Sequence, residues 1–216
     1  MYLSRLYLSS RNRQAARDLG NAYALHQTLR WAFPGAGEEA VPLPAGERLL
    51  WRDDAAKGLL VQSLTPPEWQ KVEVRWPGYL TSAPDVRIFA LDGLREGDEL
   101  VFRLRANVTV SRFRDDQDKA HDPRTRRQAL RGAPEQVAWL QRQGERGGFE
   151  VIGTDIVQSG NVRLYKGRTS QRITLFAVTF EGLLRIHDAT LLADTVQGGI
   201  GKAKALGFGL LSLARA

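Results

Sequence analysis

The stretch "VFRLRANVTVS", Val101 to Ser111, decides the fold because apolar and polar residues alternate along it from Phe102 onward. A period of two is the pattern of a β-strand with one buried face. The stretch therefore predicts a sheet with a core on one side and a basic, polar surface on the other. The core face carries Phe102, Leu104, Ala106, Val108 and Val110, and the other face carries Arg103, Arg105, Asn107, Thr109 and Ser111.

The residues after this strand predict a helix, further strands, a second helix and a last strand. "APEQVAWLQRQG", 133–144, has the proline and glutamate of a helix start and ends in glycine. Asp188 is placed to cap a helix over 189–197. Strands are predicted over 161–167, 171–180, 181–186 and 207–214.

The residues before it follow a similar order. A strand is predicted over 2–8, a helix over 21–33, a strand pair over 47–53 and 58–64, and a further strand over 86–91. No convincing helix is predicted between the last two strands, because prolines interrupt that segment. These prolines are Pro66, Pro67, Pro77 and Pro84.

The order strand, helix, strand, strand, helix, strand thus occurs twice, with the second helix of the first half only poorly marked. It is the split βαβ pattern of a ferredoxin-like domain. We expect an α+β fold of two tandem ferredoxin-like (RRM-like, βαββαβ) domains, at 1–90 and 99–216, with a basic seam between them. A single α+β sandwich is the alternative.

Composition points to a polyanionic partner. The chain has 216 residues, with 31 Lys+Arg against 24 Asp+Glu, a formal charge of +7 and a pI near 10.0. Such a field attracts nucleic acid. The absence of cysteine excludes disulfides and thiolate metal sites. No long apolar run is present, so we expect a cytoplasmic protein.

Tyr23 and His26 lie three residues apart in the first predicted helix, within "NAYALHQTLRWAFP". With about 100° of turn per residue, they share a stripe with Arg30, beside an apolar stripe that can pack on a sheet. Histidine is the side chain best suited to moving protons near neutral pH. The alternative is a boundary pair with no chemistry.

Basic residues gather in two further segments. "SRFRDDQDKAHDPRTRRQALRG", 111–132, follows the strand that carries Arg103 and Arg105, and 161–172 predicts a basic hairpin. Either could contact phosphates, and either could be a solvated charged surface. The candidate contacts to nucleic-acid phosphates are Arg30, Arg103, Arg105, Arg112, Arg114, Arg163, Lys166, Arg168, Arg172, Lys202 and Lys204.

The segment "GGIGKAKALGFGLL", 198–211, is rich in glycine but matches neither the Walker pattern nor G-x-G-x-x-G. A nucleotide cofactor is therefore not predicted. No two of the three histidines have the spacing of metal ligands, so no metal site is expected either. Gly199, Gly201, Gly207 and Gly209 would allow close approach of another backbone.

Five segments taken together resemble the CasE family, the CRISPR RNA-processing endoribonucleases of the Cascade surveillance complex. They are "YLSRLYL", "YALHQTLRWAFP", "FRLRANVT", "QVAWLQRQ" and "GGIGKAKALGFGLLSLA", in this order. The family's C-terminal signature, two Gly-apolar-Gly units five residues apart, is met by 199–201 and 207–209. The chain departs most from the family at 112–131 and 144–172.

The resemblance implies tandem ferredoxin-like domains and metal-independent cleavage at the base of the hairpin in CRISPR repeat RNA. It also implies that the product stays bound as the guide RNA, among other Cascade subunits, and that Tyr23 and His26 serve the reaction. The ribose 2′-OH would attack the phosphorus and leave a 2′,3′-cyclic phosphate and a 5′-OH. His26 would move a proton as base or acid, and Tyr23 would orient the ribose or donate to the phosphate.

Two other hypotheses stay open at this point. One is a non-catalytic RNA-binding subunit of a ribonucleoprotein complex. The other is a general ribonuclease that pairs His26 with His121 or His187.

Overall fold

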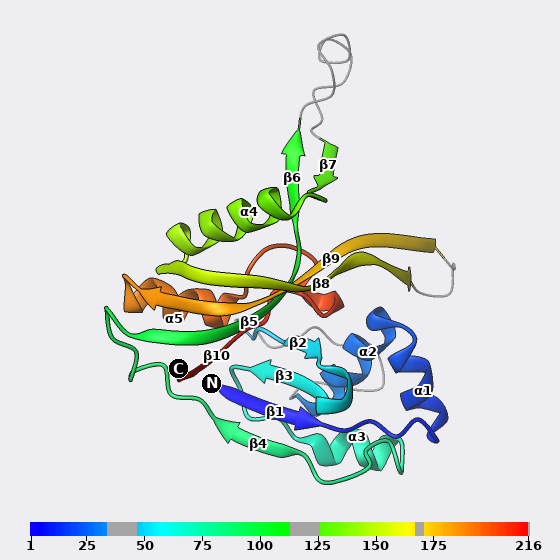
Figure 1. The fold of residues 1–216 in the computed structure, drawn as a ribbon. Helices are drawn as coiled ribbons and strands as arrows, with labels where there is room; N and C mark the ends of the chain where they lie inside the picture. The colour runs from blue at the N-terminus through cyan, green and yellow to red at the C-terminus, as the bar shows by residue number, and fades with distance from the viewer. Residues whose placement is uncertain (34–46, 113–125, 167–170, 216) are drawn as a thin grey trace.

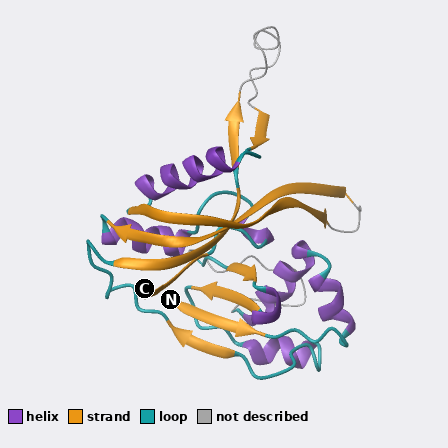
Figure 2. Cartoon of the chain, viewed as in Figure 1, coloured by secondary structure: helices purple, strands orange, loops and turns teal. Residues whose placement is uncertain are grey.

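The chain forms two four-stranded antiparallel sheets, one from each half of the sequence, with helices packed on them (Figures 1 and 2). The computed structural model describes residues 1–33, 47–112, 126–166 and 171–215. Within this part of the chain, none of the helices is long and apolar enough to cross a membrane.

The first sheet has the strand order β2-β3-β1-β4. Helices α1, α2 and α3 belong to this half, and the single turn η1 continues α2. The bounds are β1 Tyr2–Leu6, α1 Arg13–Leu19, α2 Ala22–Leu29, η1 Arg30–Ala32, β2 Leu50–Asp53, η2 Ala55–Lys57, β3 Leu59–Ser63, α3 Trp69–Arg75 and β4 Asp85–Ile88.

The second sheet has the order β10-β5-β9-β8, and a separate two-stranded sheet, β6-β7, rises above it (Figure 1). Strands β8 and β9 form one long hairpin. The bounds are β5 Glu99–Asn107, β6 Thr109–Arg112, β7 Arg126–Ala129, α4 Ala133–Arg146, β8 Phe149–Lys166, β9 Gln171–Ile186, α5 Ala189–Gly198, η3 Lys204–Leu206 and β10 Leu211–Arg215.

Counted along each half, both sheets place the fourth strand beside the first, then the third, then the second. A helix follows the first strand and another follows the third in both halves. This is the ferredoxin-like arrangement, so the predicted α+β fold of two tandem ferredoxin-like domains is confirmed. The alternative of a single sandwich is wrong, because each half closes its own sheet.

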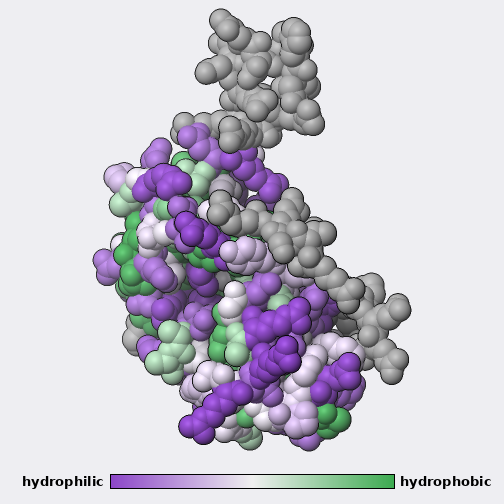
Figure 3. All heavy atoms as spheres, turned by 90° about the vertical axis from the view of Figure 1, so that its right-hand side faces the viewer, coloured by the Kyte–Doolittle hydropathy of each residue, from purple (hydrophilic) through white to green (hydrophobic). Residues whose placement is uncertain are grey.

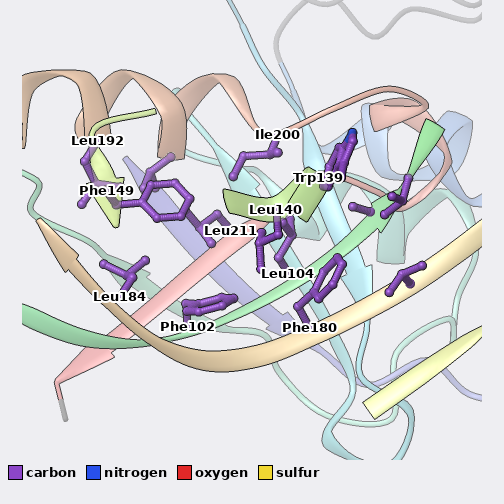
Figure 4. Packing of buried hydrophobic residues seen from close by; sticks show 14 of the residues in the cluster. Phe102, Leu104, Trp139, Leu140, Phe149, Phe180, Leu184, Leu192, Ile200 and Leu211 are labelled. Carbon is purple, nitrogen blue, oxygen red and sulfur yellow. The ribbon is translucent and has the colours of Figure 1, made fainter. Parts of the chain in front are cut away.

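Each sheet has its own apolar core. In the second half, α4 and α5 press Trp139, Leu140 and Leu192 onto Leu104 and Phe180 of the sheet (Figure 4). In the first half, Leu25 and Leu29 of α2 join Leu6, Trp51 and Tyr79. Fully burying a large apolar side chain contributes roughly 1.5–3 kcal/mol, so these two clusters account for the separate stability of the two layers.

Several predicted boundaries differ from the structure. Helix α3 forms between Pro67 and Pro77, because Trp69 and Val72 bury one side of this short helix in the first core. Helix α1 was not predicted at all. Helix α4 continues through Gly144 to Arg146, and the two predicted strands over 171–186 are one strand, β9.

The strand over 101–111 also divides in two. It leaves the second sheet after Asn107, and Thr109 to Arg112 pair with β7 instead. The alternation is uninterrupted because both pieces have one buried side: Val108 is fully buried and Val110 packs on the second core.

The two halves meet face to face along a groove of about 900 Å³. Arg52 of β2 is only 3% exposed and crosses this junction. Its guanidinium donates to the main-chain oxygens of Arg103 and Leu210 and to Ser212 Oγ. It also binds both carboxylate oxygens of Asp54, whose second partner is Arg5. A buried ion pair is therefore one of the contacts that hold the two sheets together.

Candidate active site

Helix α2 carries Tyr23 and His26, as predicted. The Asn21 side chain accepts a hydrogen bond from the Tyr23 main-chain N–H and so caps the helix. Leu25 and Leu29 anchor one side in the first core. The predicted stripe of Tyr23, His26 and Arg30 lies at the edge of that core, where all three side chains are half-buried.

Helix α2 lies where the two halves meet. It contacts the single turn η3 and strand β8, which both belong to the second half (Figure 1). On its other side it packs on α1, where Gln14 Nε2 lies 3.3 Å from Thr28 Oγ1. His26 thus projects from a helix that is held from both domains.

The Nδ1 atom of the His26 ring is buried and has no hydrogen-bond partner among the described residues. Burial, together with the charge of Arg30 one helical turn away, lowers the pKa of His26 to about 4. The imidazole is therefore neutral at pH 7 and can accept a proton. A buried nitrogen without a partner is uncommon in protein interiors and is typical of functional sites.

Arg30 begins the turn η1 that continues α2. Its Nε is also buried and has no partner in the described part of the chain. His26 on α2 and Arg30 in η1 thus each hold an unsatisfied polar atom, and Arg30 is a permanent cation. A site with a neutral imidazole beside a guanidinium can bind an anion and transfer a proton next to it.

The glycine-rich segment supports α2 from the second half. Gly199, Gly201, Gly207 and Gly209 all have positive φ angles. A Cβ on Gly207 would lie 2.6 Å from the Trp51 ring, and one on Gly199 would lie 2.8 Å from Leu50, so both positions require glycine. A Cβ on Gly199 would also lie 2.9 Å from the main-chain oxygen of Gly209, so two parts of this segment's backbone approach each other closely. The segment packs on β2 and places η3 against α2.

Three of the predicted basic residues lie on elements that meet at α2. Arg163 is exposed on β8. Lys202 is exposed, at a main-chain bridge to Asn107. Lys204 lies in η3, where its ammonium donates to the main-chain oxygen of Gly198. Burial and the nearby charges of Arg48 and Lys202 lower the pKa of Lys204.

Arg103 and Arg105 correct one expectation. The polar face of the strand over 101–111 was expected to be exposed, but the first half covers it. Arg103 lies 3.1 Å from Glu181 and 3.7 Å from Asp54. Arg105 stacks on Phe208 at 5.1 Å, and burial lowers its pKa. The predicted basic seam exists, but carboxylates neutralise part of it. RNA contact by these two arginines stays a prediction.

The other predicted residues cannot be placed in full. Arg112, Lys166 and Arg172 lie on β6, β8 and β9. Arg114, Arg168 and His121 lie outside the described residues. His187 follows β9 at the end of the sheet away from α2 (Figure 1). The structure therefore does not bring His187 to His26.

Arg52 and Asp54 were missed by the sequence reasoning. The signal was a charged pair inside the apolar run "LLWRDD", where a strand side chain on either face was expected to be apolar or solvated. Only the second sheet shows why an arginine is buried there. Among the described residues, no group of three or more His, Cys, Asp or Glu side chains could hold a metal ion.

Comparison with known proteins places the chain. Residues 1–215 match the family model described as CRISPR associated protein. The chain is 35% identical to the CRISPR-associated endoribonuclease Cse3 of Thermus thermophilus, over 99% of this chain and 100% of that one. It is 34% identical to the Cascade subunit CasE of Escherichia coli, over 99% of both.

A solved structure gives the same result. The structure of the CRISPR endoribonuclease Cse3 bound to a 19-nucleotide RNA superposes with a TM-score of 0.79 at 35% identity, covering 99% of this chain and 98% of that one. The glycine signature, the double ferredoxin-like fold and these full-length matches agree. The chain belongs to the CasE family of CRISPR-associated proteins.

Proposed function

We propose that this protein is a metal-independent endoribonuclease that cuts CRISPR precursor RNA at the base of the repeat hairpin. The observation that carries the proposal is the state of His26. It is a neutral imidazole with a pKa of about 4, one turn from a cation, on a helix at the junction of the two domains. The names of the relatives from T. thermophilus and E. coli support the same activity and setting.

The reaction needs a base, a cation and an acid. Because Nδ1 of His26 is buried, the proton falls to Nε2. Nε2 takes the proton of the ribose 2′-OH, and that oxygen attacks the adjacent phosphorus. The bond from phosphorus to the 5′ oxygen breaks, the leaving oxygen takes up a proton from water, and the imidazolium then releases its proton to solvent. The products are a 2′,3′-cyclic phosphate and a 5′-OH.

The neighbouring side chains have positioning and electrostatic roles in this proposal. Tyr23 lies one turn before His26 and orients the ribose or donates to the phosphate. Arg30 stabilises charge on the phosphorane. Arg163, Lys202 and Lys204 contact the phosphates of the RNA stem. The base edges of the stem lie in a deep, narrow groove, so side chains cannot read them there. No cofactor takes part.

The proposal extends to the protein's setting. The processed guide RNA stays bound, and the other protein partners are Cascade subunits, as for the E. coli relative. The protein works in the cytoplasm. Residues 1–90 and 99–216 act as its two domains, with α2 on the first and the β8–β9 hairpin and glycine-rich loop on the second.

A cleavage assay on the host's own repeat RNA in EDTA tests the proposal. We expect the wild-type protein to cut once and leave a 2′,3′-cyclic end. A 2′-deoxy substitution at the scissile nucleotide must abolish the cut, since it removes the nucleophile. His26→Ala must lower the rate by about 10²–10⁴-fold, with a smaller effect for Tyr23→Phe.

His187→Ala is the matched control, because it removes a surface histidine at the far end of the sheet. It is expected to cut like the wild type. RNA binding without any turnover would contradict catalysis and support a non-catalytic guide-binding subunit. Cleavage that survives the 2′-deoxy substitution would rule out the mechanism.

A further inference from the structure

A second basic pocket lies on the first domain, on the far side of α1 from the domain junction. It has a volume of about 540 Å³. We call it the α1–α3 pocket. Arg13 and Arg17 of α1 line it together with Arg75 and Trp76 at the end of α3, and with Asn12 and Pro77.

The two arginines of α1 point to the same side. They are four residues apart, so they lie one above the other on the helix surface. Both are exposed, whereas Ala15 and Asp18 on the opposite side are buried. Figure 3 shows hydrophilic side chains gathered over the lower part of the face on which α1 lies. The charge is thus directed outward and away from the core.

The pocket has a net positive charge. None of the lining residues is acidic. Among the described residues, Arg13, Arg17 and Arg75 form no ion pair. Asp18 interacts electrostatically with Arg17, but its carboxylate is buried and accepts hydrogen bonds from Tyr79 and Gln14. Three like charges around one hollow repel each other, and an anion between them would relieve that repulsion.

Arg75 is held in a fixed place by aromatic rings. Its guanidinium carbon lies 5.5 Å from the centre of the Trp31 ring and 5.9 Å from that of Trp76. A stacked guanidinium keeps its N–H edges free, and those edges match a phosphate in a bidentate way. Trp76 itself lines the pocket and is half-buried. A half-buried tryptophan beside arginines offers a surface on which a nucleobase can stack.

The pocket and the candidate active site lie on neighbouring helices. Helix α1 packs directly on α2, and Gln14, which lines the pocket, contacts Thr28 on the side of α2 turned away from His26. An RNA strand held at His26 would have to cross the outside of α2 and α1 to reach Arg13 and Arg17. A duplex would not offer a base to Trp76, because its bases are stacked on each other. A single strand would.

We propose that the α1–α3 pocket binds a single-stranded nucleotide of the repeat RNA outside the hairpin. Arg13, Arg17 and Arg75 hold its phosphate, and Trp76 stacks on its base. The identity of the RNA rests on the proposed function, but the recognition chemistry does not. The pocket adds a second point of contact that selects RNA with an unpaired flank.

The test compares two non-cleavable RNAs, each with a 2′-deoxy scissile nucleotide. One is the repeat hairpin alone, and the other adds the single-stranded flanks. Arg13→Gln/Arg17→Gln is expected to weaken binding of the flanked RNA by about tenfold in fluorescence anisotropy and to leave binding of the bare hairpin unchanged. Loss of the phosphate contacts also lowers the salt dependence, by about one unit of slope for each contact.

Arg142→Gln/Arg146→Gln on α4 is the matched control. It removes two exposed arginines with the same spacing on another helix. It is expected to bind both RNAs like the wild type. If the α1 variant matches this control on the flanked RNA, the proposal is wrong. If it weakens both RNAs equally, the arginines act on the hairpin and the proposal is also wrong.

A crosslink locates the contact directly. A flanked RNA with 5-iodouridine in the unpaired segment is irradiated with the full-length protein and digested with trypsin. We expect the RNA on the peptide 76–87, which contains Trp76, and a large loss of that crosslink in Trp76→Leu, which removes the aromatic ring. A crosslink confined to other peptides would overturn the proposal.

These readouts are independent of cleavage. If His26→Ala cuts normally, the proposed mechanism fails while the difference between flanked and bare RNA stands. If the flanks make no difference while His26→Ala abolishes the cut, only the inference about the α1–α3 pocket fails.

Discussion

Arg52 of the first sheet donates a hydrogen bond to the main-chain oxygen of Arg103 in the second sheet, with 2.9 Å between Nη1 and that oxygen. The same guanidinium binds Asp54, and the Arg52 Nε to Asp54 Oδ1 distance is 2.6 Å. Both side chains are almost fully buried. This buried ion pair thus contributes to the orientation of the two domains, and with it to the place of α2 against η3 and β8.

Arg52→Met is expected to lower the free energy of unfolding by about 3–5 kcal/mol, because it leaves the Asp54 carboxylate buried without its main partner. Arg52→Met/Asp54→Asn removes both charges and is expected to recover part of that loss. Urea unfolding followed by tryptophan fluorescence measures both. Arg87→Gln is the control, since Arg87 pairs with Asp85 on the surface. It is expected to change little. An equal loss in the single and double variants would contradict the argument.

His26 is expected to titrate with a pKa of about 4 in the RNA-free protein. Burial and Arg30 disfavour its charged form, whereas in the unfolded chain it titrates near its ordinary value of 6.5. NMR of the imidazole protons measures this, and the signal that vanishes in His26→Gln assigns it. A pKa at or above 6.5 in the free protein would contradict the buried placement.

The lowered pKa of His26 also predicts how stability depends on pH. Between about pH 4 and 6.5 the His26 side chain is protonated in the unfolded state but not in the folded state. Stability from this group is therefore complete above 6.5 and falls as pH drops toward 4, by about 3 kcal/mol in total. The difference between wild type and His26→Gln, from urea unfolding at several pH values, isolates it from the other titrating groups. A difference independent of pH would contradict it.

The pH dependence of cleavage separates base from acid. kcat/KM reports the pKa of the free enzyme. If His26 is the base, kcat/KM is constant from pH 6 to 8, apart from other groups, and falls only as pH drops toward about 4. If His26 were the acid, kcat/KM would already fall tenfold per pH unit above about 4. Initial rates at low RNA concentration decide between the two.

Gly207→Ala is expected to destabilise the protein by at least about 2 kcal/mol. A positive φ costs an alanine about 1–2 kcal/mol, and the new Cβ would also strike the Trp51 ring. Gly198→Ala is the matched control in the same segment, because no atom lies within 4 Å of its Cβ. It is expected to be neutral or slightly stabilising. Thermal unfolding compares the two, and equal melting temperatures would show that the close contact is absent.

The repeated order of elements could be predicted from the sequence. Each strand or helix that packs on a core shows its own hydrophobic period in the local sequence, whatever it packs against. It missed α1 and α3, which are short helices. Helix α3 lies between prolines, and only the burial of Trp69 and Val72 against the first sheet stabilises it. The apolar pattern of so short a helix is a weaker indication than the surrounding prolines, which indicate a break in regular structure.

The candidate site was predicted in part for the same reason. Tyr23 and His26 share a helix, so their relation is local and readable. The protonation state of His26 cannot be predicted from the sequence, because it depends on how deeply tertiary packing buries the ring. Arg103 and Arg105 were assigned to solvent because an alternating strand shows only that its two faces differ. The sheet of the first half covers the polar face of this strand, and the sequence of the strand alone does not indicate that contact.

The β8–β9 hairpin has two mechanically different parts. From Ala177 to Arg185, β9 is paired on both sides, with β5 and with β8. From Gln171 to Phe176 it is paired with β8 alone. A two-stranded ribbon twists more and bends more easily than a full sheet. The outer part, which carries Arg163, can therefore change its curvature more easily than the inner part, which is paired on both sides. One hairpin thus has a rigid inner part within the four-stranded sheet and a more flexible two-stranded outer part.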